Sequence, residues 1–289
     1  MRGAAFLLAL LLAGCGGGAA RYTVGEPYRM GGVWSYPRED FSLVETGLAA
    51  RHAGPGWGGQ TANGEAWSDG RALAAHRTLQ LPAVVLVTNL ENGRSLAVRV
   101  NDRGPVQPGR VIGLSSRAAA LLGVPEGGTA QVRVAVDGDR SRALSEAVPG
   151  RAATTVPIET APRAAVASES LAPPPGARAA GTVAAAVPVR QAAAEVTPVA
   201  AADLALPETV TQGAPHPGRL YVEAGTLSRP DAAARLAARV PGARVEAFGP
   251  RRDQQYRVRL GPFADAASAD AALERTLAAG VSGARILVD

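Results

Sequence analysis

Short runs of apolar residues recur through the first half of the chain and predict β-strands. Several of them alternate apolar with polar side chains, as a strand with one buried face does. The runs cover residues 84–88, 95–100, 111–114 and 131–136, and the first two are joined by the turn pair Asn92-Gly93. Many short strands with Gly and Pro turns predict a small β-barrel over residues 47–137. One short helix is expected inside it, capped by Ser115-Ser116 and ended at Gly123.

The end of the chain mixes strand and helix periods. Two segments, residues 230–240 and 266–279, carry apolar side chains three and four apart and predict amphipathic helices. Four strands are expected around them, at residues 220–225, 244–248, 256–260 and 284–288. The order β-α-β-β-α-β over residues 217–289 is that of a split βαβ, ferredoxin-like α+β sandwich.

Composition separates these two regions from the rest. With 34 Gly, 22 Pro and only 4% aromatic residues, much of the 289-residue chain lies outside a packed core. Residues 138–216 are rich in Ala, Pro and Thr, with few large apolar side chains, and are predicted to be a disordered linker. Residues 16–46 are rich in Gly, Tyr and Pro and are predicted to be an extended arm.

The N-terminus resembles that of a bacterial lipoprotein. The apolar run at residues 4–12 follows Met1-Arg2 and is too short to span a bilayer, which is typical of a signal peptide. It ends in LAGC, which resembles a lipobox and implies cleavage before Cys15 and lipidation of it. The alternative is an ordinary signal peptide with an incidental cysteine. Gly16 in place of Asp implies, by resemblance to sorted lipoproteins, an anchor on the periplasmic face of the outer membrane.

Charge and residue spacing argue against several other classes of protein. All 30 basic residues are Arg, and they are scattered, so the net charge of +5 does not predict nucleic-acid binding. His52, His76 and His216 lack metal-ligand spacing, and there is no second cysteine. No Gly-rich phosphate loop follows a strand. We therefore expect no metal and no cofactor.

Several motifs in the first predicted domain occur in a familiar order. They are QTANGE (60–65), AAHRTL (74–79), VTNLENGRSLAVRVNDRGP (87–105) and GRVIGLSSRAAALLG (109–123). Together they resemble the rare lipoprotein A family, septal lytic transglycosylases with a six-stranded double-psi β-barrel. Residues 220–240 and 255–280 resemble the SPOR domain, which implies binding to peptidoglycan glycan strands stripped of stem peptides. The resemblance also implies enrichment at the division septum and contact with division-site proteins.

The resemblance implies a specific chemistry. A lytic transglycosylase cleaves the MurNAc–GlcNAc bond without water, because the C6 hydroxyl of the muramic sugar attacks C1 and closes a 1,6-anhydro ring. One carboxyl can then serve first as acid and later as base. By resemblance, Asp102, Glu65 and His76 match the family's catalytic positions, with Asp102 the acid/base and Glu65 a neighbour that raises its pKa. For each there is a structural alternative: an Asx-turn, a solvated loop charge and a satisfied buried histidine.

Other residues near these motifs are candidates for substrate contact. Thr61 and Asn63 are expected to donate to sugar hydroxyls, Asn101 to orient the acid and Arg103 to contact the glycan. In the SPOR-like region the candidates are Tyr221, Tyr256 and Phe263, with Arg257 and Arg259 for polar groups. The alternative for these aromatic residues is a place in the hydrophobic core.

The chain departs from the family in two places in the barrel. Arg51-His52 stands where an aromatic pair is usual, with Trp57 as a candidate replacement, and Gly113 stands where the family has Asp. In the SPOR-like region Glu223 replaces the usual Gln. We predict a lytic transglycosylase acting at the septum. The alternative is a weak or inactive glycan-binding, wall-tethering lipoprotein with an expansin-like barrel.

Overall fold

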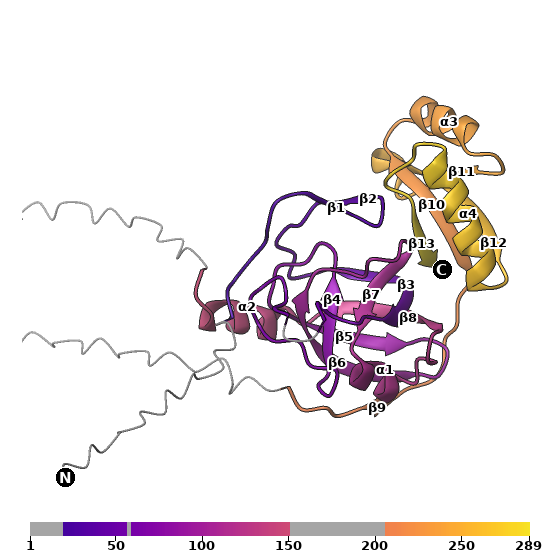
Figure 1. Cartoon of the computed structure of the whole chain (residues 1–289). Coiled ribbons are helices and arrows are strands. Elements are labelled where there is room, and N and C mark those ends of the chain that lie inside the picture. Colours follow the sequence, from indigo (N-terminus) through magenta and orange to yellow (C-terminus); the bar gives the residue numbers. More distant parts are fainter. Residues whose placement is uncertain (1–19, 57–58, 151–205) are drawn as a thin grey trace, which may run out of the picture. The chain divides into compact units, whose positions relative to one another are not determined.

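The computed structural model describes residues 20–56, 59–150 and 206–289, which form a β-barrel and a separate α/β domain (Figure 1). Three features predicted from the sequence lie outside the described residues: the lipobox with Cys15, the side chain of Trp57, and residues 151–205 of the predicted linker. Among the described residues, no helix is both long and apolar enough to cross a membrane.

Six strands close the barrel. They are β3 (Val44–Arg51), β4 (Leu73–His76), β5 (Ala83–Asn89), β6 (Arg94–Asp102), β7 (Arg110–Leu114) and β8 (Thr129–Val136). Their order is β4-β7-β3-β8-β5-β6, and β6 returns to pair with β4. The pairs β3–β7 and β4–β6 are parallel and the others antiparallel. The predicted six-stranded double-psi barrel is thus confirmed.

Alternating side chains from these strands fill the barrel. Seven of them are fully buried and form the centre of one apolar cluster: Val85, Val87, Leu96, Val98, Ile112, Val132 and Val134. The short helix α1 (Ser116–Leu122) begins where predicted, because the Ser115 hydroxyl accepts from the Ala118 amide. It ends at Gly123, whose φ of 72° is the left-handed conformation that glycine adopts without strain.

Both ends of the predicted linker are ordered, which differs from the sequence-based expectation. Helix α2 (Gly138–Ala147) begins at Asp137, whose side chain accepts from the Arg140 amide, and buries Leu144. The Ser141 hydroxyl is hydrogen-bonded to both backbone groups of Val84 on β5. The average composition of residues 138–216 does not reveal this helix, because it depends on one capping residue and one buried leucine.

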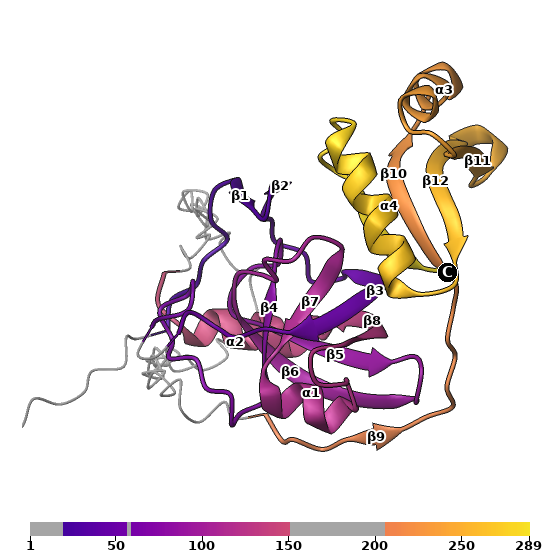
Figure 2. The same ribbon diagram turned by 45° about the vertical axis from the view of Figure 1, so that its right-hand side comes forward.

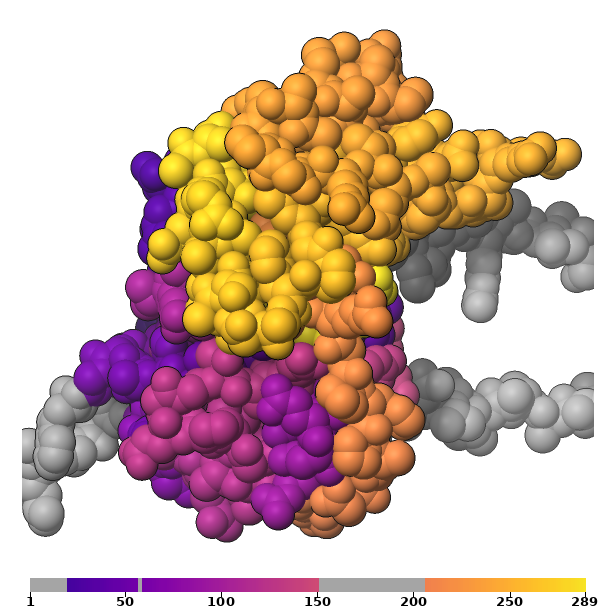
Figure 3. Space-filling view, turned by 90° about the vertical axis from the view of Figure 1, so that its right-hand side faces the viewer, coloured from indigo at the N-terminus to yellow at the C-terminus, as the bar shows by residue number. Residues whose placement is uncertain are grey.

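At the other end of that range, β9 (Thr211–Gln212) pairs antiparallel with the first residues of β6. Glu208 accepts from the Ala72 amide at 2.9 Å and from the Arg117 guanidinium at 2.8 Å. Figure 3 shows this orange segment lying along the magenta barrel surface. The chain is therefore ordered again before the second domain begins.

The arm before the barrel is extended and bound to it. It carries a small hairpin of β1 (Tyr28–Met30) and β2 (Val33–Ser35). Thr23 and Leu81 exchange two backbone hydrogen bonds of 2.7 Å, and the Tyr28 hydroxyl donates to the carbonyl of Arg77 at 2.8 Å. The side chains of Trp34 and Tyr36 remain 47% and 62% exposed.

The second domain has the predicted βαββαβ order. Its elements are β10 (Leu220–Leu227), α3 (Pro230–Arg239), β11 (Arg244–Phe248), the short 3-10 helix η2 (Arg251–Asp253), β12 (Gln255–Phe263), α4 (Ala266–Ala278) and β13 (Arg285–Val288). The strands form an antiparallel sheet in the order β11-β12-β10-β13. Figure 2 shows α4 running beside this sheet, and the buried side chains Val222, Val258, Leu273 and Ile286 lie in the core between them.

Candidate active site

Asp102 ends β6, and its two carboxyl oxygens have different surroundings. Oδ1 accepts from the backbone amides of Ala62 at 2.9 Å and of Arg103 at 2.8 Å. Oδ2 lies 3.2 Å from Nε2 of His52. The bond from Arg103 is local, but it comes from the next residue, so it is not the Asx-turn given as the alternative for Asp102, which would accept from the amide two residues on. The bond from Ala62 is different, because it ties the carboxyl to the loop that carries Glu65.

Glu65 is held as a carboxylate in a buried network. Nε of Arg99 donates to its two oxygens at 3.0 and 3.2 Å, and Nη2 of Arg99 also contacts Oε1. The amides of Asn101 and Asn63 donate at 3.0 and 2.8 Å. Burial raises the pKa of Glu65, but the bonds and charge of Arg99, with the two amides, outweigh it, and the pKa is lowered.

This arrangement does not place the Glu65 carboxylate against Asp102. In the described part of the chain, no hydrogen bond or ion pair joins the two carboxyl groups, and the negative charge of Glu65 faces Arg99 instead. The two residues are linked only indirectly: Ala62, three residues before Glu65, binds Asp102, and Asn101, the residue before Asp102, donates to Glu65. Among the described residues, no direct contact between Glu65 and Asp102 therefore supports the expected role of Glu65 in raising the pKa of Asp102.

The polar side chains of this loop are used internally. The Thr61 hydroxyl donates to Oδ1 of Asn63 at 2.8 Å, and it also lies 3.0 Å from the carbonyl of Glu65. Thr61 and Asn63 are buried, with 4% and 1% of their surface exposed, so they fix the loop rather than face a sugar. Asn101 is fully buried and binds Glu65, while its Oδ1 has no hydrogen-bond partner among the described residues.

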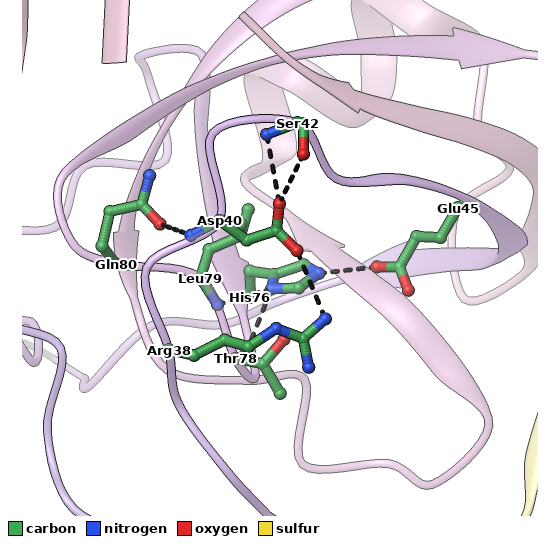
Figure 4. Close-up of polar contacts among 8 residues, drawn as sticks. All are labelled: Arg38, Asp40, Ser42, Glu45, His76, Thr78, Leu79 and Gln80. Carbon is green, nitrogen blue, oxygen red and sulfur yellow. Dashed lines mark hydrogen bonds and ion pairs between the residues drawn. The ribbon is translucent and has the colours of Figure 1, made fainter. Parts of the chain in front are cut away.

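His76 lies in a different network from Asp102. Its Nδ1 accepts from the backbone amides of Thr78 at 3.2 Å and Leu79 at 3.1 Å, and Nε2 lies 2.7 Å from Oε1 of Glu45 (Figure 4). Because Nδ1 accepts, the ring proton is on Nε2 and is donated to Glu45. Burial raises the pKa of Glu45, but the hydrogen bond from His76 and nearby arginine charges outweigh it, and the pKa is lowered.

The strand register explains why His76 and Asp102 are apart. Ala75 is the residue paired with Asp102 between β4 and β6. Successive side chains of a strand point to opposite faces, so His76 faces away from the side that Ala75 and Asp102 share. The geometry therefore matches the satisfied buried histidine that the sequence offered as the alternative.

We expect replacement of His76 to destabilise the fold. His76→Ala leaves the amides of Thr78 and Leu79 and the Glu45 carboxylate without their partner, which costs about 2–3 kcal/mol. Urea unfolding followed by circular dichroism measures this. His216→Ala is the matched control, because the His216 side chain is exposed. An unchanged midpoint for His76→Ala would contradict the structural role.

The side chain of Arg103 contacts the arm and does not face the place where a sugar would meet Asp102. Its guanidinium donates to the carbonyls of Val24, His76 and Leu79, the bond to His76 being 3.3 Å long. Only its backbone amide contacts Asp102. The predicted contact of Arg103 with the glycan is thus replaced by contacts with backbone carbonyls of the arm and the barrel.

The candidates in the second domain are divided between the two faces of its sheet. Tyr256 and Phe263 pack against the apolar core cluster, which matches the core alternative. The Tyr221 ring instead lies under the Arg259 guanidinium, 4.3 Å from its centroid, and Arg257 lies 3.8 Å over the Phe248 ring. The face away from the helices thus carries aromatic rings covered by arginines.

One residue of the site was noted in the sequence only as a departure. His52 follows β3 and reaches Asp102 from 50 positions away. Its local sequence, ARHAG, has no feature that predicts this contact. Within residues 20–56, 59–150 and 206–289, no three His, Cys, Asp or Glu side chains are grouped as a metal site requires.

Comparison with known proteins identifies both domains. Residues 49–134 match the family model described as lytic transglycolase, and residues 217–286 match the SPOR domain model. An endolytic peptidoglycan transglycosylase RlpA from Pseudomonas aeruginosa strain UCBPP-PA14 is 36% identical over 258 residues, covering 83% of this chain and 70% of that protein. The chain belongs to the RlpA family.

Other members of the RlpA family agree. The protein of that name from P. aeruginosa PAO1 is 39% identical over 83% of this chain and 70% of its own length. The RlpA of Vibrio cholerae is 37% identical over 45% of this chain and 61% of its own length. Among solved structures, the SPOR domain of P. aeruginosa RlpA matches at 24% identity with a TM-score of 0.23, covering 24% of this chain and 99% of that one. The RlpA relatives and the two family models together confirm the family resemblance predicted from the sequence.

Proposed function

We propose that this RlpA family member is a lytic transglycosylase that cleaves β-1,4 bonds between MurNAc and GlcNAc in peptide-stripped glycan strands. The observation that carries the residue assignment is the asymmetry of Asp102. Its Oδ1 is held by two backbone amides, so Oδ2 is the oxygen left to exchange a proton with substrate. The names of the relatives and the paired domains support the activity.

In the proposed mechanism, Asp102 gives a proton and then takes one back. Protonated Oδ2 donates to the glycosidic oxygen as the bond from C1 to that oxygen breaks and positive charge develops at C1. The C6 hydroxyl of the same muramic sugar then attacks C1, and its proton returns to Oδ2. The products are a free GlcNAc hydroxyl and a 1,6-anhydroMurNAc end, with no water consumed.

Location is part of the same proposal. Lipidation of Cys15 would attach the protein to the periplasmic face of the outer membrane. The SPOR domain would concentrate it at the septum, where stripped strands and division-site proteins are found. On the face of its sheet away from the helices, Arg259 over the Tyr221 ring and Arg257 over the Phe248 ring would be the groups that meet the polar atoms of a sugar.

Digestion of purified sacculi tests the activity. Protein lacking residues 1–15 is incubated with intact and with amidase-treated sacculi, and the products are identified by mass spectrometry. We expect anhydro ends from amidase-treated sacculi. Reducing ends would mean hydrolysis instead. No products, with the protein still sedimenting with stripped sacculi, would favour the glycan-binding, wall-tethering alternative.

A further inference from the structure

The carboxyl of Asp102 has a close partner in His52. Nε2 of His52 lies 3.2 Å from Oδ2, and the two side chains are only 10% and 11% exposed. Two amides occupy Oδ1, which leaves Oδ2 for the proposed reaction. His52 therefore contacts the reacting oxygen. A carboxylate oxygen has two lone pairs, so Oδ2 can accept from His52 and still face a sugar oxygen.

Two glycines leave the room that the His52 ring occupies. A Cβ on Gly113 would lie 2.8 Å from the Cβ of His52 and 3.2 Å from its Cγ. A Cβ on Gly104 would lie 2.9 Å from Cε1 of the ring. Carbon atoms do not approach this closely, so a side chain at either position would displace the imidazole. The ring of Trp67 contacts the imidazole edge-on, with centroids 5.0 Å apart.

The two departures of the barrel from the family pattern are therefore neighbours in space. Strands β3 and β7 are parallel, and the backbone amide of His52 donates to the carbonyl of Leu114, next to Gly113, at 2.8 Å. Gly113 has no side chain, and the imidazole of His52 occupies the space next to it. Glycine at position 113 thus leaves room for an imidazole that places a polar group against Asp102.

We propose that His52 is a positioning residue for Asp102. The Nε2–H group of its imidazole donates to Oδ2, directs the other lone pair of that oxygen toward the sugar, and stabilises the carboxylate after it has given up its proton. This inference rests on the proposed role of Asp102 as acid and base.

The shape of the side chain at position 52 provides the first test. His52→Gln places an amide nitrogen near the position of Nε2, whereas the side chain of His52→Asn is too short to reach Oδ2. Losing one hydrogen bond to a charged group lowers kcat about 10- to 100-fold in His52→Ala and His52→Asn. We expect His52→Gln to stay within about fivefold of the parent and KM to change less than about twofold. Equal activity of His52→Ala and the parent would overturn the proposal.

Gly113 gives a second, independent variant. Gly113→Ala puts a methyl group against the Cβ of His52 and should lower kcat as His52→Ala does. The double variant His52→Ala/Gly113→Ala should be no worse than His52→Ala alone, because both changes remove the same contact. Full additivity of the two losses would show that Gly113 acts without His52.

Nitrogen NMR of the three histidines tests the contact without measuring activity. In the parent, the His52 shifts should report a proton on Nε2. In Asp102→Asn, the amide group of the new side chain would face the ring and donate to Nε2, so the proton should move to Nδ1. A parent ring protonated on Nδ1, or shifts that Asp102→Asn leaves unchanged, would overturn the inference. A parent that yields no anhydro ends while the tautomer still switches would overturn only the proposed function.

Discussion

Replacing Asp102 by Asn should lower the rate at which anhydro ends form by about a thousandfold. The amide cannot donate a proton to the glycosidic oxygen and then recover one. Its carbonyl oxygen can still accept from the amides of Ala62 and Arg103, so the end of β6 and the loop should keep their structure. The rate of product formation on amidase-treated sacculi, measured by mass spectrometry, gives the loss.

Two controls make this result specific to chemistry. The thermal midpoint of Asp102→Asn should match that of the parent, and its sedimentation with stripped sacculi should be unchanged. Activity within tenfold of the parent would remove Asp102 from the role of acid and base. Loss of activity together with loss of folding would point to the structural contacts of Oδ1 instead.

Replacing Arg99 by Met should lower the free energy of unfolding by about 3–5 kcal/mol, which is more than we expect for His76→Ala. The Arg99 side chain is 7% exposed and that of Glu65 is 17% exposed, so the variant leaves a nearly buried carboxylate without its cation. Urea unfolding at neutral pH measures the loss. Arg140→Ala, which removes a partner from the exposed pair with Asp137, is the control and should change stability little.

The pH dependence of this loss has a definite sign. In the parent, the pKa of Glu65 is lowered, so its contribution to stability is present above the unfolded pKa of about 4.3 and is lost as pH falls through the folded pKa. Without Arg99, burial is no longer outweighed and the pKa of Glu65 rises. The difference between parent and variant should therefore be greatest near neutral pH and shrink in acid. A difference independent of pH would contradict the ion pair as its cause.

Most of the fold follows from local patterns in the sequence. The turn at Asn92-Gly93, the cap at Ser115 and the stop at Gly123 each have a local physical cause and lie where predicted. Local patterns do not predict strands β3 and β4, because VETGLAAR and LAAH lack both alternation and a β-branched run. Their place is determined by pairing across the closed barrel, which a local pattern does not contain.

The site was harder to predict for the same reason. Asp102 and Glu65 could be named from their motifs, but the ion pair of Glu65 with Arg99 joins residues 34 positions apart. His76 could be named but not oriented, since the register of β4 against β6 decides which face it occupies. In the sequence, His52 is only a departure from the aromatic pair that is usual in the family. Its contact with Asp102 depends on space left by Gly113 and Gly104 on other parts of the barrel.

Arg103 joins the arm to the strand end that carries Asp102, because its guanidinium binds the carbonyl of Val24 while its backbone amide binds Asp102. A protein tethered through Cys15 would receive any pull from the envelope through this arm. The load would first meet the bonds of Arg21 to Asn63 and of Thr23 to Leu81, and Asn63 follows Ala62, whose amide binds the proposed acid. In a protein tethered in this way, tension would thus pass into the loop and the strand end that hold the Asp102 carboxyl.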